Sequence, residues 1–162
     1  MDCFRIEGGR RLSGRVTVDG SKNASLPLMA AALLSDGPVD FSGIPELSDT
    51  ANMLRLLEEL GLEVTRPTDG VTRFRTIDPT AVHARYDIVR TMRASICVLG
   101  PLLARRGKAV VSMPGGCAFG SRPVDLHLRG LEALGAKITL DGGDIHCSAD
   151  RLRGTTIFLG GP

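Results

Sequence analysis

The chain has 162 residues, of which 43% are hydrophobic and 23% charged, as in an ordinary globular protein of about one domain. Its 20 basic and 18 acidic residues leave a formal net charge of +2, which gives no electrostatic case for a nucleic-acid or membrane partner. No apolar run reaches the length of a membrane span, and the N-terminus lacks the apolar centre of a signal peptide.

The cysteines indicate a reduced, cytoplasmic protein without a metal site. Cys3, Cys97, Cys117 and Cys147 do not form the closely spaced pairs of zinc sites or thioredoxin-like centres. Cys117 lies in a glycine-rich segment. The other three fall on expected strands or on an expected buried helix, so we interpret them as small core residues.

The first part of the chain alternates between strands and helices. In order, we expect short strands between Phe4 and Gly20, a helix from Ala24 to Leu34, a strand from Val39 to Ile44, an amphipathic helix from Ser48 to Leu60 and a strand beginning at Leu62. Asn23 is the expected N-cap of the first helix. Because that helix is apolar all round, it should be buried on every side.

The same order of elements recurs about 70 residues later. Ala94-Ser95 repeats Ala24-Ser25, and Leu131-Glu132 repeats Leu57-Glu58 at a slightly larger offset. The second unit should contain a buried helix from Arg93 to Ala104, a strand from Ala109 to Met113 and a helix from Val124 to Leu134. A third unit should begin near Arg151, which corresponds to Arg11.

These repeats predict an α/β fold. A helix that is apolar on all faces needs cover on all faces, which neighbouring units and their sheets can supply. We therefore expect sheets outside and apolar helices gathered at the centre. Two units and the start of a third also lead us to expect an incomplete piece of a larger protein.

A glycine-rich segment joins the strand and helix of the second unit. It reads Met113-Pro-Gly-Gly-Cys-Ala-Phe-Gly-Ser-Arg-Pro-Val-Asp-Leu-His127, and its glycines let the backbone approach a ligand closely. A thiol here, near Arg122 and a helix N-terminus, can have a lowered pKa and act as an acid or nucleophile. Residue types alone leave a second interpretation open, a plain connection with an inert cysteine.

Three motifs together resemble the UDP-N-acetylglucosamine 1-carboxyvinyltransferases, the enolpyruvyl transferases of peptidoglycan synthesis. They are Gly20-Ser-Lys-Asn-Ala24, Arg90-Thr-Met-Arg-Ala-Ser95 and the segment from Pro114 to His127, and the resemblance covers the whole chain. It implies two domains of three repeats each, every domain an inside-out α/β barrel. Residues 1–21 would be strands of the second domain, and residues 22–162 an incomplete first domain.

The resemblance also implies a reaction. The enolpyruvyl group of phosphoenolpyruvate would be transferred to the 3-hydroxyl of UDP-N-acetylglucosamine with release of phosphate, the first committed step of peptidoglycan synthesis. No cofactor is implied. The C-terminal part of the same protein would complete the active site between the domains, so we expect the 162 residues alone to be inactive.

Site residues follow from the same resemblance. It implies catalytic roles for Cys117, Lys22 and Arg122, and Cys117 would match the reactive cysteine that forms an adduct with phosphoenolpyruvate and is the target of fosfomycin. The implied substrate-binding residues are Lys22, Asn23, Arg93, Arg122, Pro123, Val124, Asp125 and Leu126. Taken singly, Lys22 fits a solvated turn, Arg93 a surface position, Asp125 a favourable charge at a helix start and His127 a local structural role.

Three rival interpretations remain. The sister enolpyruvyl transferase of the shikimate pathway has a similar fold, but its pattern does not include the cysteine segment. RNA 3′-phosphate cyclases share related repeats, but this sequence has no basic face. A non-catalytic folded module with residual nucleotide binding fits the isolated chain.

Overall fold

The described chain begins with a segment without helix or strand, which is followed by the first helix. A computed structural model describes residues 3–66, 70–113, 124–158 and 160. Helix α1 (Lys22–Ala31) continues into the short 3-10 turn η1 (Ala32–Leu34). Within the described residues, no helix combines the length and apolar character that crossing a membrane requires.

The first unit is a three-stranded sheet with a helix. Strand β1 (Val39–Ser42), helix α2 (Ser48–Glu59), strand β2 (Leu62–Thr65) and strand β3 (Val71–Thr76) follow α1. The strand order is β1-β3-β2, with β3 antiparallel to both neighbours. β1 and β2 therefore run parallel, joined by α2, and β3 lies between them. Alternation along β3 turns Phe74 to the core, where its ring meets that of Phe41 edge-on.

The second unit repeats this arrangement. Its first helix is the 3-10 segment η2 (Arg93–Val98) followed by α4 (Leu99–Arg106). Strand β5 (Lys108–Ser112), helix α5 (Asp125–Ala133), strand β6 (Lys137–Asp141) and strand β7 (Asp144–Ser148) follow. The order β5-β7-β6 matches β1-β3-β2, and the short strand β4 (His83–Ala84) adds a parallel edge to β5. Helix α3 (Tyr86–Val89) links β4 to η2.

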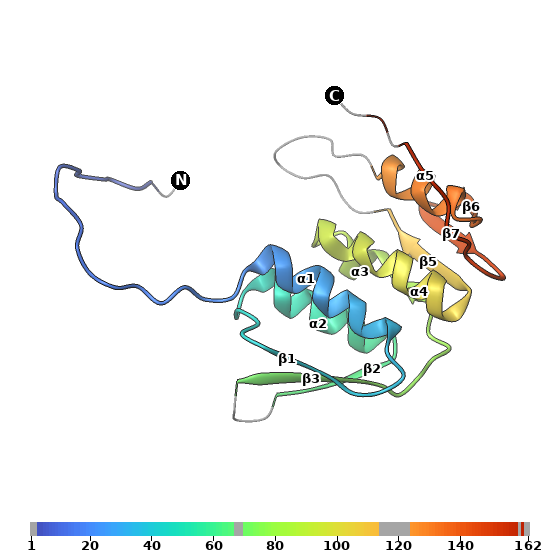
Figure 1. Cartoon of the computed structure of the whole chain (residues 1–162), viewed down its shortest axis with the longest axis horizontal. Helices are drawn as coiled ribbons and strands as arrows, with labels where there is room; N and C mark the ends of the chain where they lie inside the picture. Colours follow the sequence, from blue (N-terminus) through green and yellow to red (C-terminus); the bar gives the residue numbers. More distant parts are fainter. Residues whose placement is uncertain (1–2, 67–69, 114–123, 159, 161–162) are drawn as a thin grey trace.

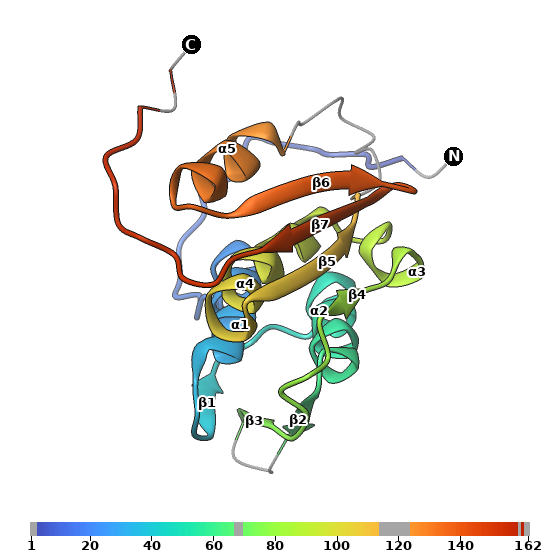
Figure 2. The same ribbon diagram turned by 90° about the vertical axis from the view of Figure 1, so that its right-hand side faces the viewer.

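Helices lie between the two sheets. Figure 2 shows the sheet β1-β3-β2 at the bottom, the sheet β4-β5-β7-β6 above, and helices α1, α2 and α4 between them. Their facing side chains form the core, in which Met29, Met53, Leu57, Leu99 and Leu102 are almost completely buried. The predicted α/β fold, with repeated units, inner helices and outer sheets, is confirmed.

Four details of the sequence-based prediction are wrong. Residues 3–20 form no helix or strand, so the strands expected between Phe4 and Gly20 are not formed in this chain. The N-cap of α1 is Ser21 rather than Asn23. Helix α1 and its continuation are not buried all round, because Leu28 and Leu34 remain about half exposed. Cys3 is exposed instead of packed in a core, because the segment around it has no partner among the described residues.

Candidate functional site

The start of α1 presents Lys22 and Asn23. The hydroxyl of Ser21 accepts a hydrogen bond from the Ala24 N–H, and the Ser25 hydroxyl donates to the Ser21 carbonyl at 2.9 Å. These bonds satisfy groups that a helix start leaves open. Lys22 and Asn23 are the first two helical residues and both are exposed. The backbone beneath them is therefore fixed while their side chains face solvent.

Gly20 lets the chain enter α1 along a tight path. A Cβ atom at this position would overlap the carbonyl oxygen of Gly43, in the turn after β1. A hollow of about 410 Å³ lies where residues 19–20 meet residues 43–47, immediately before α1 and α2. Because a backbone oxygen cannot move aside cheaply, glycine at position 20 sets how the first motif reaches its helix.

Lys22 forms an ion pair across to α2. Its Nζ lies 2.7 Å from Oδ2 of Asp49, the second residue of that helix. The neighbouring Thr50 is completely buried. Its hydroxyl accepts a hydrogen bond from the Leu47 N–H at 3.0 Å and donates to the Pro45 carbonyl at 2.6 Å. The first turns of α1 and α2 are thus adjacent and joined.

Arg93 opens the first helix of the second unit. Two residues later, the fully buried Ser95 donates its hydroxyl to the Met92 carbonyl at 2.6 Å, which fixes the start of η2. Helix α1 packs against η2, so Arg93 belongs to the same helical layer as Lys22. The arginine itself is half-buried.

The start of α5 carries the remaining described residues of the expected site. Val124 is buried and precedes the helix, while Asp125 and Leu126 are exposed in its first turn. His127 is also exposed, and its N–H donates to the Val124 carbonyl at 3.0 Å. The expected site residues Cys117, Arg122 and Pro123 lie outside the described residues.

The helix starts converge on one end of the molecule. In Figure 1, α1, α2, α4 and α5 run from left to right, so their N-terminal ends face the same way. The carboxyl ends of β1 and β5 lead to the starts of α2 and α5 at this end. Open N–H groups and the helix dipole at an N-terminus favour an anion. This end, with Lys22 and Arg93, is therefore suited to phosphate and carboxylate groups.

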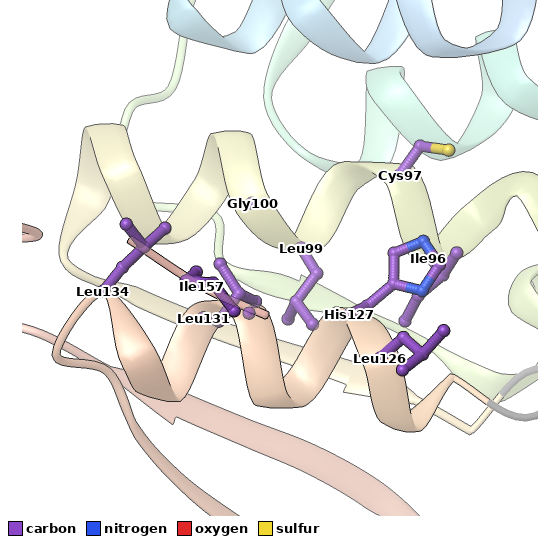
Figure 3. A pocket seen from close by; sticks show the side chains of 10 residues that line it. Ile96, Cys97, Leu99, Gly100, Leu126, His127, Leu131, Leu134 and Ile157 are labelled. Carbon is purple, nitrogen blue, oxygen red and sulfur yellow. The ribbon is translucent and has the colours of Figure 1, made fainter. Parts of the chain in front are cut away.

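An apolar cleft lies between α4 and α5. It has a volume of about 430 Å³, and Figure 3 shows side chains from η2, α4 and α5 lining it. Those side chains include Ile96, Leu99, Leu126, Leu131 and Leu134, together with Ile157. The cleft reaches the start of α5 at Leu126 and His127, next to the anion-favouring end. Its apolar walls suit hydrocarbon or ring surfaces rather than charged groups.

A polar cluster lies on the strands of the second sheet. The Ser112 hydroxyl donates to Oδ1 of Asp144 at 2.5 Å, and Nε2 of His83 lies 3.5 Å from the other carboxylate oxygen. Because the aspartate lies between the serine and the histidine, the arrangement is not that of a histidine-activated serine nucleophile. Instead, these contacts join the carboxyl end of β5 to the neighbouring strands β7 and β4.

The described cysteines beyond Cys3 are poorly suited to reaction. Burial raises the pKa of the Cys97 thiol, and burial with the charge of Glu132 raises the pKa of Cys147 to about 11. Since the thiolate is the reactive form, both side chains behave as core residues at neutral pH. The interpretation of Cys97 and Cys147 as packing residues agrees with this.

Sequence reasoning missed Asp49 and the tight passage at Gly20. Asp49 stands in the first turn of α2, as Asp125 stands in the first turn of α5, the equivalent helix of the second unit. Comparing the two units turn by turn would have drawn attention to it. The close approach of Gly20 to Gly43 cannot be recognised from a short stretch of sequence, because the two glycines belong to separate turns.

Comparison with known proteins gives one family match and several relatives. The sequence model of the family described as EPSP synthase (3-phosphoshikimate 1-carboxyvinyltransferase) matches residues 6–161. UDP-N-acetylglucosamine 1-carboxyvinyltransferase 2 of Carboxydothermus hydrogenoformans is 52% identical over 162 residues, which are 100% of this chain and 38% of that protein. UDP-N-acetylglucosamine 1-carboxyvinyltransferase of Saccharophagus degradans is 51% identical over 170 residues, covering 99% of this chain and 40% of that protein. The chain thus spans about two fifths of the length of these relatives.

Solved structures match the fold. The enolpyruvyl transferase NikO from Streptomyces tendae superposes with a TM-score of 0.70 at 24% identity, over 90% of this chain and 32% of that one. EPSP synthase from Acinetobacter baumannii gives a TM-score of 0.63 at 19% identity, over 88% of this chain and 33% of that one. At these identities the match concerns the fold alone.

Proposed function

Because this chain belongs to the EPSP synthase family, we propose that it is the N-terminal part of an enolpyruvyl transferase acting on UDP-N-acetylglucosamine. The observation that carries the proposal is the meeting of helix N-termini around Lys22, at the end of the fold where anions are favoured. The reaction needs such a place, since phosphoenolpyruvate carries both a phosphate and a carboxylate.

The proposed reaction proceeds by addition and elimination. The 3-hydroxyl group of the sugar gives its proton to a base while its oxygen bonds to the carbon of phosphoenolpyruvate that bears the phosphate, and an acid adds a proton to the methylene carbon, which becomes a methyl group. A proton is then removed from that methyl group, the carbon–oxygen bond to phosphate breaks, the carbon–carbon double bond re-forms, and inorganic phosphate leaves. Chemistry of this kind needs cationic groups at the two anions and an acid for the methylene carbon.

Each site residue has a role in this proposal. Lys22 and Asn23 contact phosphoenolpyruvate and the sugar, Arg122 pairs with phosphoenolpyruvate, and Cys117 supplies the acid. The chain from Arg122 to Leu126 takes part in holding the uridine nucleotide, and Arg93 binds substrate. The positions of Lys22, Asn23, Arg93 and Asp125 at helix starts that face one end of the fold support these roles.

The acceptor is proposed from the relatives. Proteins that are 51–52% identical over the whole chain are named for UDP-N-acetylglucosamine, whereas the EPSP synthase structure matches at 19% identity. The cysteine segment supports the same choice over shikimate 3-phosphate. The proposed location is the cytoplasm.

The proposal includes a C-terminal part of the same protein as partner. Residues 1–21 would add strands to its second domain. In support, Phe4, Ile6, Val16 and Val18 alternate with other residues along the chain and are almost fully exposed. Such a segment has backbone groups and apolar side chains available for a sheet.

Phosphate release tests the proposal. In the full-length protein, made by extending this reading frame, Lys22→Ala and Arg122→Ala should each lower phosphate release from phosphoenolpyruvate by about 10²-fold or more. Lys108→Ala is the matched control, because this exposed lysine begins β5 at the opposite end of the sheet. Equal rates for Lys22→Ala and Lys108→Ala would contradict the proposal.

A further inference from the structure

An ion pair at the candidate site joins two helices that are separated by a strand in the sequence. Lys22 Nζ and Asp49 Oδ2 are 2.7 Å apart, and the two side chains are 43% and 30% exposed. The pair is therefore open to solvent on one side. A ligand anion could reach the ammonium without displacing the aspartate, since an ammonium group has three N–H donors.

The backbone on both sides of this pair is fixed. On α1, the Ser21 and Ser25 hydroxyls complete the first turn. On α2, the buried Thr50 hydroxyl joins the Leu47 N–H to the Pro45 carbonyl, directly beside Asp49. Behind both turns, Met29 of α1 and Met53 of α2 are fully buried in the core. The backbone that carries Asp49 is thus fixed by contacts that do not involve Lys22.

The charges favour this division of roles. A carboxylate in the first turn of α2 is stabilised by the helix dipole, whereas an ammonium in the first turn of α1 is opposed by it. A lysine side chain is also long and flexible, so orienting its charge costs conformational entropy. The Asp49 carboxylate offsets both effects before any substrate arrives.

We infer that Asp49 is a positioning residue, whose carboxylate holds the Lys22 ammonium where it meets the anionic substrate. The inference rests on the proposed function, in which Lys22 contacts phosphoenolpyruvate. Asp49 acts through Lys22 and does not itself touch the reacting atoms. The ion pair is retained in the complex, so the aspartate assists anion binding although its own charge is negative.

The first measurement follows the amine itself. In the full-length protein, trace acetic anhydride should acetylate Lys22 several-fold faster in Asp49→Asn than in the wild type, because the variant frees the amine. Asp40→Asn is the matched control: Asp40 pairs with Arg73 at 2.6 Å, on the strands β1 and β3 away from this site. An unchanged Lys22 rate in Asp49→Asn would overturn the inference, whatever reaction the protein catalyses.

The second measurement is kinetic. Asp49→Asn should lower kcat/KM for phosphoenolpyruvate by about tenfold, and Asp49→Glu should recover most of that loss. In a Lys22→Ala background, Asp49→Asn should have no further effect, since a residue acting through Lys22 is not additive with its loss. Asp49→Ser serves as a second neutral variant if asparagine disturbs folding, because serine also removes the charge and is smaller.

The outcomes separate the two proposals. An unchanged or raised kcat/KM in Asp49→Asn, or a full tenfold loss in the Lys22→Ala background, would overturn the positioning role. A wild-type protein that releases no phosphate would overturn the proposed function, while the acetylation result still decides whether Asp49 holds Lys22.

Discussion

The Arg106 guanidinium, in the last turn of α4, donates a hydrogen bond of 2.8 Å to the main-chain carbonyl of Leu60, at the end of α2. The same group also bonds to the carbonyl of Ala81, in the segment that joins the two units. Burial disfavours the charged form and lowers the pKa of Arg106. A partly buried cation thus ties the second repeat to the first.

Replacing Arg106 should loosen the junction between the repeats. Arg106→Met leaves the Leu60 and Ala81 carbonyls without this donor, so the free energy of unfolding should fall by about 2 kcal/mol, measured by urea denaturation. The neighbouring Arg105 is an exposed side chain paired with Asp36, so Arg105→Met should stay within about 0.5 kcal/mol of the wild type. An equal decrease in the free energy of unfolding in the two variants would mean that the Arg106 hydrogen bonds do not stabilise the junction.

Gly20→Ala should disturb the entry to α1. Its Cβ would overlap the Gly43 oxygen, so the chain must shift at a cost of about 1–3 kcal/mol. Because Lys22 follows two residues later, the full-length protein should also lose the proposed phosphate release from phosphoenolpyruvate. Gly37→Ala is the control, since a Cβ at Gly37 meets no atom within 4 Å. Thermal melting and phosphate release would measure both effects. A melting temperature and a rate equal to those of the wild type in Gly20→Ala would show that the Gly43 oxygen does not restrict position 20.

Cys147 should react with thiol reagents only at high pH. Burial raises its pKa from an ordinary value of 9.0 to about 11, so its thiolate fraction at pH 7 should be about 100-fold lower than that of an ordinary thiol. Labelling should rise about tenfold per pH unit up to that value. The exposed Cys3 is the internal comparison for the labelling rate. Because Cys3 would also react, the labelling of Cys117 has to be followed in the Cys3→Ser variant. Equally fast labelling of Cys147 and Cys3 at pH 7 would contradict the burial.

The same pKa shift affects stability in a defined direction. Above about pH 9 the unfolded Cys147 thiol ionises while the folded one stays protonated, so the unfolded state binds fewer protons. Stability from this group should therefore be fully present below pH 9 and decrease between pH 9 and pH 11. Denaturation curves of the wild type and Cys147→Ala across this range should converge as the pH rises.

The exposed side of α1 should make the 162-residue chain self-associate. Leu28 in α1 and Leu34 in its continuation η1 are both about half exposed. Sedimentation should show concentration-dependent oligomers that Leu28→Glu converts to monomers. Ile77→Glu, at another exposed apolar position, should leave them intact. A clean wild-type monomer at every concentration would rule out this role for α1.

The repeated elements were predictable because their signals are local. Apolar spacing and bounding glycines predicted β1, α2, β5 and α5, and the structure places each within a few residues of the expected range. A match between Ala24-Ser25 and Ala94-Ser95 was enough to pair the first helices of the two units. Such patterns depend only on residues a few positions apart, so they can be read without knowing the fold.

Features that depend on distant contacts could not be read in this way. Ser21 and Asn23 are both good N-cap residues, and in the structure Ser21 takes this position, with its hydroxyl accepting from the Ala24 N–H. Composition likewise indicated that α1 is apolar, but it did not indicate which faces of the helix would pack against other elements. The start of the helix at Arg93 adopts a 3-10 conformation, which its apolar pattern did not indicate.

In the candidate site, too, the residues in short motifs were predictable, whereas those that depend on distant contacts were not. Motifs predicted Lys22, Asn23, Arg93 and Asp125 as site residues, and in the structure each of them lies at or next to the start of a helix. The role of Asp49 depends on α1 and α2 lying side by side, which no short motif records. Electrostatic partners from another helix are therefore the part of the site that sequence alone conceals.

The acceptor preference of the full-length protein tests the central proposal most directly. Phosphate release from phosphoenolpyruvate should be measured with UDP-N-acetylglucosamine, with shikimate 3-phosphate and with neither, and the product identified by mass spectrometry. We expect release only with UDP-N-acetylglucosamine, together with a product heavier by one enolpyruvyl group. Faster release with shikimate 3-phosphate, or release without any acceptor, would contradict the proposal.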